Sequence, residues 1–191
     1  ILGCSEQTID RRVNGNNIRG GKHAVQTRVK ITGGLIEDAG YDAGLYMYDH
    51  RIWIKDPAWA NSRWTVNSLK AVSEYEHLYV MWKPGQYSID REKLSGLEWR
   101  EWGARGLWTI RSVRSNDEHE AMFPLELAER VVRLFSDEGD LVLDPFMGSG
   151  TTAIAALKHG RHYVGFEKEA KYVDLATKRI QRYELQGRLE F

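Results

Sequence analysis

A hydrophobic segment, a glycine-rich turn and an alanine-rich segment follow one another in the last third of the chain, and this succession restricts the fold most. Residues 140–144 (DLVLD) predict a buried strand, residues 146–152 (FMGSGTT) a turn, and residues 153–158 a helix. Residues 162–167 (HYVGFE) predict a second strand, and residues 171–183 a second helix. The resulting β-α-β-α succession is typical of doubly wound α/β folds.

The glycine turn has the chemistry of a ligand cradle. Gly148 and Gly150 allow a sharp turn and a close approach of a ligand to the main chain. The helix that follows presents free N–H groups and a positive dipole end, which favour a carboxylate. Asp144 is placed to hold a cationic amino group. Glu167 ends the next strand, where an acidic residue hydrogen-bonds ribose hydroxyls in such folds. We therefore expect a nucleoside cofactor that carries an amino-acid group.

Two other interpretations compete with this one. The turn could be an ordinary tight turn of an α/β protein, or part of a dinucleotide-binding fold in a nicotinamide-dependent oxidoreductase. The three-glycine fingerprint of that fold is absent, because Thr151 and Thr152 follow the two glycines. The flanking strand, the helix and the spacing of Glu167 favour cofactor binding over a simple turn.

Composition sets broad limits on the class of protein. The 191 residues leave room for one well-buried domain, and 27 basic residues balance 27 acidic ones. This balance allows a local basic cleft but gives no global attraction to nucleic acid. The single cysteine, Cys4, excludes an internal disulfide and favours a reducing, cytoplasmic setting. No apolar run approaches a membrane span. The first residue is Ile1 rather than Met, so we expect a processed, truncated or incomplete protein.

The upstream elements are predicted less sharply. A polar start precedes a helix over 23–38 that Gly40 ends, strands over 50–54 and 76–82, an irregular tryptophan-rich stretch over 86–115, and a helix over 124–135.

The stretch DPFMGSGTT at residues 144–152 resembles the cofactor motif of the permuted, beta-group amino DNA methyltransferases. Residues 119–124 (HEAMFP) resemble the family's segment just before that strand, which packs over the cofactor. Glu167, followed by Tyr172, Ala176 and Arg179, matches the family's closing helix. Residues 53–55 and 74–83 resemble two later strands of its sheet. The match covers roughly residues 40–184.

This resemblance implies a Rossmann-like α/β sheet with helices on both faces and S-adenosyl-L-methionine as the cofactor. The implied reaction is site-specific methylation of adenine N6 or cytosine N4 in double-stranded DNA, as in restriction-modification systems. The target base would be flipped out of the duplex, because its amine is otherwise paired inside. The residues assigned to the cofactor are Phe123, Pro124, Asp144, Pro145, Phe146, Gly148, Ser149, Gly150, Thr151 and Glu167.

The family's catalytic loop, an Asp/Asn/Ser-Pro-Pro-aromatic sequence, has no counterpart among the four prolines, none of which is adjacent to another. In the permuted family it would lie upstream of Ile1, so we expect the catalytic-loop strand to be missing from this chain. The nearest imitation gives weak catalytic candidates in Asp56, Pro57 and Trp59, although a loop beside the target base or the DNA is the better interpretation. The chain could thus be part of an enzyme, or a non-catalytic fragment or subunit. In the second case an upstream segment or another copy would supply the loop.

The resemblance divides the chain into four predicted segments. Residues 1–39 form a loop and helix of an incomplete catalytic region, and residues 40–85 form later strands of the sheet. Residues 86–118 form a DNA-contacting insert, and residues 119–191 form the cofactor-binding unit.

Basic residues near tryptophans predict DNA contact, because phosphates need cations and rings can stack on bases. The candidates are Arg63, Arg91, Arg105, Arg111 and Arg114. We place Trp53 and Trp82 in the core, because each lies in a predicted strand. His159 and His162 have loose metal-ligand spacing, but nothing else supports a metal, and none is predicted.

Overall fold

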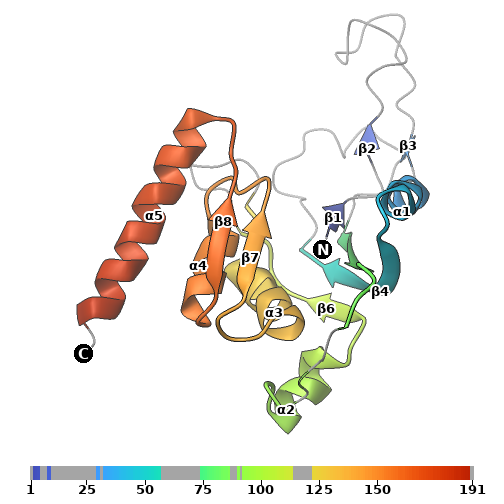
Figure 1. Cartoon of the computed structure of the whole chain (residues 1–191), viewed down its shortest axis with the longest axis horizontal. Coiled ribbons are helices and arrows are strands. Elements are labelled where there is room, and N and C mark those ends of the chain that lie inside the picture. Colours follow the sequence, from blue (N-terminus) through green and yellow to red (C-terminus); the bar gives the residue numbers. More distant parts are fainter. Residues whose placement is uncertain are drawn as a thin grey trace, which may run out of the picture. The chain divides into compact units, whose positions relative to one another are not determined.

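The computed structural model describes residues 2–4, 8–9, 29–30, 32–56, 74–86, 90, 92–113 and 122–189. The chain divides into two compact units, one of residues 1–86 and 106–109, the other of residues 87–105 and 110–191 (Figure 1). The four segments expected from the sequence stay a prediction. Among the described residues, no helix combines the length and the apolar character needed to cross a bilayer.

The first unit is built on a four-stranded sheet in the order β1-β5-β4-β6. Its strands are β1 (Leu2–Cys4), β4 (Tyr46–Ile54), β5 (Tyr75–Trp82) and β6 (Leu107–Thr109). β4 and β5 pair antiparallel, and β6 joins β4 in parallel. The predicted strand over 76–82 is confirmed, and the one over 50–54 begins four residues earlier. The short strands β2 (Thr8–Ile9) and β3 (Val29–Lys30) pair separately.

Two tryptophans lie in the core of this sheet. Trp53 is 4% exposed and Trp108, its partner across β4 and β6, is 1% exposed. The guanidinium of Arg51 lies 5.1 Å from the ring centroid of Trp108, so a cation–π contact adds to the packing. The core position predicted for Trp53 is confirmed. Trp82 is only half-buried and lies against Tyr46, with 6.2 Å between ring centroids.

The predicted helix over 23–38 is wrong at residues 29–30, and its residues 23–28 and 31 lie outside the described residues. The helix α1 spans Gly33–Asp42, and Val29–Lys30 before it is strand β3. Gly40 lies inside the helix rather than at its end, and its missing side chain lets Met81 of β5 approach closely: a Cβ at this position would meet Met81 Cε at 2.6 Å. This close approach between distant segments is a tertiary effect that local sequence rules do not detect.

The second unit contains the predicted β-α-β-α succession. It consists of α3 (Leu125–Phe135), β7 (Leu141–Asp144), α4 (Thr151–Lys158), β8 (His162–Gly165) and α5 (Ala170–Leu189). β7 and β8 pair in parallel, with Asp144 opposite Gly165. α4 contacts both strands as well as α3 and α5. The two strands and three helices predicted for this part of the chain are confirmed, although α5 extends to Leu189.

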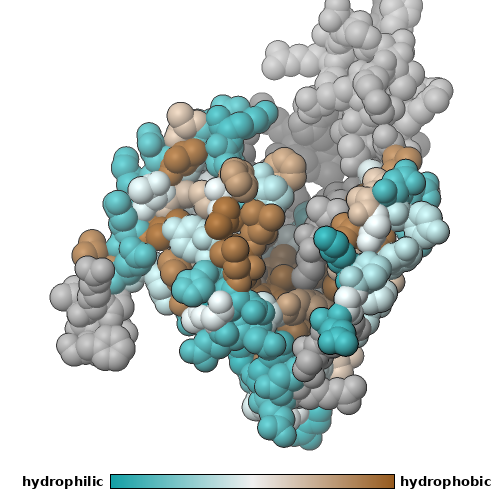
Figure 2. Space-filling model, viewed as in Figure 1, coloured by the Kyte–Doolittle hydropathy of each residue, from teal (hydrophilic) through white to brown (hydrophobic). Residues whose placement is uncertain are grey.

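The predicted burial of the first strand is wrong on one face. Val142 packs against Ala128 and Val132 of α3 and against Ala155 of α4. The opposite face is apolar but exposed, with Leu141 64% and Leu143 61% exposed. Hydrophobic residues gather on the surface where Figure 1 draws β7 and β8 (Figure 2). In the described residues of this unit the helices therefore cover one face, because α3, α4 and α5 all pack on the same side. The second layer of helices stays a prediction.

The stretch predicted to be irregular is instead partly helical. α2 (Gly96–Glu98) begins at a capping box, in which the Ser95 hydroxyl accepts from the Glu98 N–H and the Glu98 carboxylate accepts from the Ser95 N–H. The five-residue π-helix η3 (Trp99–Gly103) follows directly. The interleaved charges masked this element in the sequence.

The element is anchored on α3 by one buried ring. Trp102 is 6% exposed, and the guanidinium groups of Arg130 and Arg133 each lie 5.5 Å from its centroid. Arg133 also pairs with Glu98 at 2.6 Å. Trp102 therefore belongs to the core of the second unit and is not available to stack on a base.

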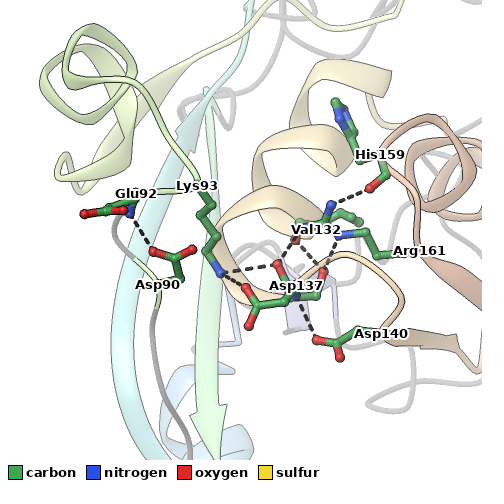
Figure 3. Close-up of polar contacts among 9 residues, drawn as sticks. Asp90, Glu92, Lys93, Val132, Asp137, Asp140, His159 and Arg161 are labelled. Carbon is green, nitrogen blue, oxygen red and sulfur yellow. Dashed lines mark hydrogen bonds and ion pairs between the residues drawn. The ribbon is translucent and has the colours of Figure 1, made fainter.

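A polar junction closes the carboxyl end of α3 (Figure 3). Arg161 donates to the Ser136 carbonyl at 2.6 Å and also to the carbonyl of His159. Lys93 donates to the same Ser136 carbonyl at 3.2 Å and to Asp137 Oδ1 at 2.9 Å. Cations at this position satisfy the last carbonyls of the helix and its negative dipole end. The junction ties α3 to the turn before β8.

We predict that the ion pair of Glu98 and Arg133 stabilises the second unit at neutral pH and that this stabilisation is lost at acidic pH. The hydrogen bond from Arg133 is the largest cause that lowers the pKa of Glu98 from 4.5 to about 2. The contribution is present above pH 4.5 and is lost as the pH falls toward 2. Urea unfolding at pH 7 should show Glu98→Gln less stable by about 0.5–1 kcal/mol, because the pair is partly exposed. This difference should shrink at pH 3.

Glu101→Gln provides the matched control, because Glu101 is an exposed carboxylate of the same helical segment. Equal stability of Glu98→Gln and Glu101→Gln at pH 7 would contradict the assignment.

Candidate cofactor site

The loop between β7 and α4 is tied to the end of β8 by one main-chain hydrogen bond and closed by another within the loop. The N–H of Met147 donates to the Phe166 carbonyl at 2.8 Å, and the N–H of Gly150 donates to the Met147 carbonyl at 2.9 Å. Gly150 caps α4 in the left-handed conformation, with φ +81° and ψ +22°. The loop and the first turn of α4 therefore lie at the carboxyl ends of two parallel strands, where open α/β folds bind their ligands.

Glu167 lies directly against this loop. Its Oε2 accepts from the Gly148 N–H at 2.9 Å, and its Oε1 accepts from the Glu169 N–H at 2.9 Å. The hydrogen bond from Glu169 is the main cause that lowers the pKa of Glu167, slight desolvation opposes it, and the bond from Gly148 adds to it. The carboxylate thus stays ionised at neutral pH. Each of its oxygens keeps a further lone pair that can accept a hydroxyl from a ligand.

Asp144 is the last residue of β7 and makes a local turn with its own side chain. Its Oδ1 accepts from the Phe146 N–H at 3.0 Å, which fixes the start of the loop. Phe146 itself is 83% exposed, so the loop presents a bare aromatic ring beside two carboxylates. A flat apolar group of a ligand could stack on this ring.

The back of the loop is buried against α5. Ser149 and Thr151 are each 4% exposed. Arg179 of α5 donates through Nη1 to the Ser149 carbonyl and to the Ser149 hydroxyl, both at 2.7 Å. The same nitrogen lies 3.7 Å from Met122 Sδ, which places the segment before α3 beside the loop. In the sequence Arg179 counts only as part of the closing helix. A donor in the position of Arg179 could have been predicted from the pair of hydroxyl residues in the tight loop, because such buried residues need a hydrogen-bond donor.

The structure places the ten predicted cofactor residues as follows. The loop and Glu167 bring together Asp144, Pro145, Phe146, Gly148, Ser149, Gly150, Thr151 and Glu167. Ser149 and Thr151 are on the buried side, so they can serve the ligand only through the main chain. Phe123 is 39% exposed, and Pro124 is buried at the N-cap of α3. Their contact with a cofactor stays a prediction.

The predicted catalytic and DNA-contact residues are described only in part. Pro57, Trp59, Arg63, Arg91 and Arg114 lie outside the described residues. Asp56 is exposed two residues after β4, in the first unit. Arg105 and Arg111 are exposed in the second unit, and the Arg105 Nε donates to the Arg100 carbonyl at 2.7 Å. Both remain accessible to a phosphate.

The two histidines considered for metal spacing lie in different surroundings. His159 Nε2 lies 3.9 Å from Glu129, and burial lowers the pKa of His159 below its usual value. His162 is exposed at the start of β8. Within the described part of the chain, no three His, Cys, Asp or Glu side chains gather where a metal ion could bind.

The geometry suits one kind of ligand. Two carboxylates, Asp144 and Glu167, favour a cationic group and hydroxyl donors. The free N–H groups of the first turn of α4 favour a carboxylate. Phe146 offers a surface for a flat ring. A nucleoside joined to a charged amino-acid chain meets all three conditions.

Comparisons with known proteins agree with this geometry. The family model described as "DNA methylase", of the N6 and N4 type, matches residues 4–178. The type II methyltransferase M.BglI of Bacillus subtilis is 60% identical over 180 residues, which are 94% of this chain and 52% of M.BglI. The chain therefore spans about half the length of this relative.

Solved structures give the same picture. A proposed DNA modification methylase of Thermus thermophilus, complexed with S-adenosyl-L-methionine, superposes with a TM-score of 0.65 and 35% identity, over 82% of this chain and 62% of that one. The complex of M1.HpyAVI with the same cofactor gives a TM-score of 0.60 and 26% identity, over 78% of this chain and 68% of that one.

We predict that Gly150→Ala destabilises the second unit more than its backbone conformation alone requires. An added Cβ would lie 3.1 Å from Ala176 Cβ on α5, and the left-handed φ costs about 1–2 kcal/mol for a non-glycine residue. Gly139→Ala is the control, because Gly139 has φ +84° and no atom near an added Cβ. Thermal unfolding should show the larger loss for Gly150→Ala. Equal losses would mean that α5 does not constrain the loop.

Proposed function

Because the chain belongs to the N6/N4 DNA methylase family, we propose that its second unit binds S-adenosyl-L-methionine and serves methyl transfer to DNA. The acceptor is the exocyclic amine of adenine (N6) or cytosine (N4). The observation that carries this proposal is the bond between Glu167 and the Gly148 N–H, which joins an ionised carboxylate to the glycine loop at the ends of β7 and β8.

The charges of the site match the cofactor. Asp144 receives the ammonium group of the methionine part, and the first turn of α4 receives its carboxylate. Glu167 accepts hydrogen bonds from the ribose hydroxyls through lone pairs that the main-chain N–H groups leave free. The two structures solved with S-adenosyl-L-methionine support this assignment, since both are similar to this chain over more than three quarters of its length.

The apolar residues match the adenine ring. Phe146 is 83% exposed and Phe166 is 60% exposed, and both border the loop that Glu167 holds. An adenine ring stacked on Phe146 would remove this surface from water. The segment with Phe123 and Pro124 borders the loop through Met122 and Arg179, so it can cover the ligand from another side.

The substrate is double-stranded DNA, with the target base flipped out of the duplex. Arg105 and Arg111 are exposed and can contact phosphates, and the contacts of Arg63, Arg91 and Arg114, which lie outside the described residues, stay a prediction from the sequence. When bound, S-adenosyl-L-methionine supplies an electrophilic methyl group on its sulfonium. The protein then has to orient the amine toward that group, because proximity and orientation account for much of the rate.

The second candidate function is that of a non-catalytic part which needs a partner segment. The chain holds four prolines and no two are adjacent, so in this candidate the Pro-Pro-aromatic loop comes from another segment, because a second copy of the same residues would lack it as well. Methyl transfer from labelled S-adenosyl-L-methionine to duplex DNA distinguishes the two. Turnover by this chain alone would exclude the second candidate. Cofactor binding without turnover would support it.

We predict that Asp144→Asn weakens binding of S-adenosyl-L-methionine at least about tenfold, the loss expected for one charge-assisted contact. Asn keeps the oxygen that accepts from the Phe146 N–H and removes only the charge. Isothermal titration calorimetry on the chain measures the dissociation constant, with NAD as a ligand that should not bind.

Glu184→Gln is the control for a simple change of net charge, because Glu184 is exposed near the far end of α5. An affinity of Asp144→Asn equal to that of Glu184→Gln would remove Asp144 from the site.

A further inference from the structure

The contacts of Arg179 give it a role beyond packing. Its Nη1 donates to two acceptors of a single loop residue, the carbonyl and the hydroxyl of Ser149, both at 2.7 Å. Thr151 Oγ1 lies 3.5 Å from the same nitrogen. Ser149 is 4% exposed, so its carbonyl cannot exchange this partner for water without opening the loop.

Two further residues of α5 pack against the same loop. Ala176, one turn before Arg179, is fully buried, and Ile180 is 7% exposed. A Cβ added to Gly150 would lie 3.1 Å from Ala176 Cβ and 3.4 Å from Ile180 Cδ1. The residues at 176, 179 and 180 share one side of the helix, as their spacing requires. That side of α5 therefore forms the back wall of the loop.

The peptide between Ser149 and Gly150 is fixed at both ends. Its carbonyl accepts from Arg179, and its N–H donates to the Met147 carbonyl at 2.9 Å. The carbonyl and the N–H of a trans peptide point in opposite directions, so a flip of this plane would break both bonds at once. A flip would also direct the Ser149 carbonyl away from α5. A carbonyl on the ligand side would repel a carboxylate at the start of α4.

We propose that Arg179 is a positioning residue for the cofactor loop. Through the Ser149 carbonyl it holds the Ser149–Gly150 peptide in the orientation that leaves the ligand side to N–H groups. This inference rests on the proposed binding of S-adenosyl-L-methionine. Arg179 itself makes no contact with the ligand, so its effect on affinity is indirect.

The test compares Arg179→Met and Arg179→Lys in the full chain with Arg182→Met, an exposed arginine of the same helix. Calorimetry gives the affinity for S-adenosyl-L-methionine, and hydrogen exchange of residues 146–151 gives the opening of the loop. Arg179→Met should bind about tenfold more weakly and exchange faster in this segment, because a buried carbonyl loses its charged donor. Arg179→Lys should recover part of both effects, since a single ammonium can reach one acceptor.

A further variant separates the two acceptors. Ser149→Ala removes the hydroxyl contact and keeps the carbonyl contact, so it should change affinity much less than Arg179→Met. A loss as large as that of Arg179→Met would overturn the assignment to the carbonyl. The proposal is also overturned if the Arg179 variants bind and exchange as Arg182→Met does. If Arg179→Met does not fold, the comparison of Arg179→Lys with Arg182→Met decides by the same two measurements.

The failure of the proposed function would look different. In that case the unaltered chain would not bind S-adenosyl-L-methionine at all, while Arg179→Met would still exchange faster over residues 146–151 than Arg182→Met. That result would keep the effect of Arg179 on the loop and remove the cofactor.

Discussion

The carboxylate of Glu167 is held by two main-chain N–H groups, from Gly148 before it and from Glu169 after it. These bonds join the turn after one strand to the end of its neighbour, and they keep the carboxylate ionised. The shape of the site depends on this arrangement, because a loop of main-chain donors needs a fixed acceptor to hold its conformation. Asp144 also contacts the loop at its start, and Arg179 contacts it on its buried side. Both act on a backbone that Glu167 already holds at Gly148.

The sequence predicted the second unit well because its signals are local. The turn with Gly148 and Gly150 joins a short apolar strand to a helix, and a second strand and helix follow directly, so spacing along the chain reflects spacing in the fold. It failed where distant segments decide the outcome. Gly40 looks like a helix end but packs on Met81, and Leu141 looks buried but is 64% exposed. The tryptophan-rich stretch looked irregular, yet two arginines from another helix cover the ring of Trp102.

The same contrast holds at the site. Asp144 and Glu167 could be named from the sequence, since each ends a predicted strand and parallel strands end at one edge. The role of Arg179 could not, because thirty positions separate it from Ser149 and no periodicity links them. The buried side of Ser149 and Thr151 was hidden for the same reason. A motif gives the residues of a loop, whereas only the tertiary structure shows which of its sides faces the protein.

The open side of β7 and β8 has a mechanical consequence for the unit. A ribbon of two strands is barely stable alone. The geometry of β7 and β8 therefore depends on α3, α4 and α5, which pack on one side of the ribbon. The exposed parts of Leu143 and Val164 contribute no burial energy to folding, which would be roughly 25 cal/mol for each Å² of apolar surface removed from water. Any layer packed over that side would therefore make the strand ends more rigid. Asp144 and Glu167 would then bind a ligand more tightly, although the added layer makes no contact with that ligand.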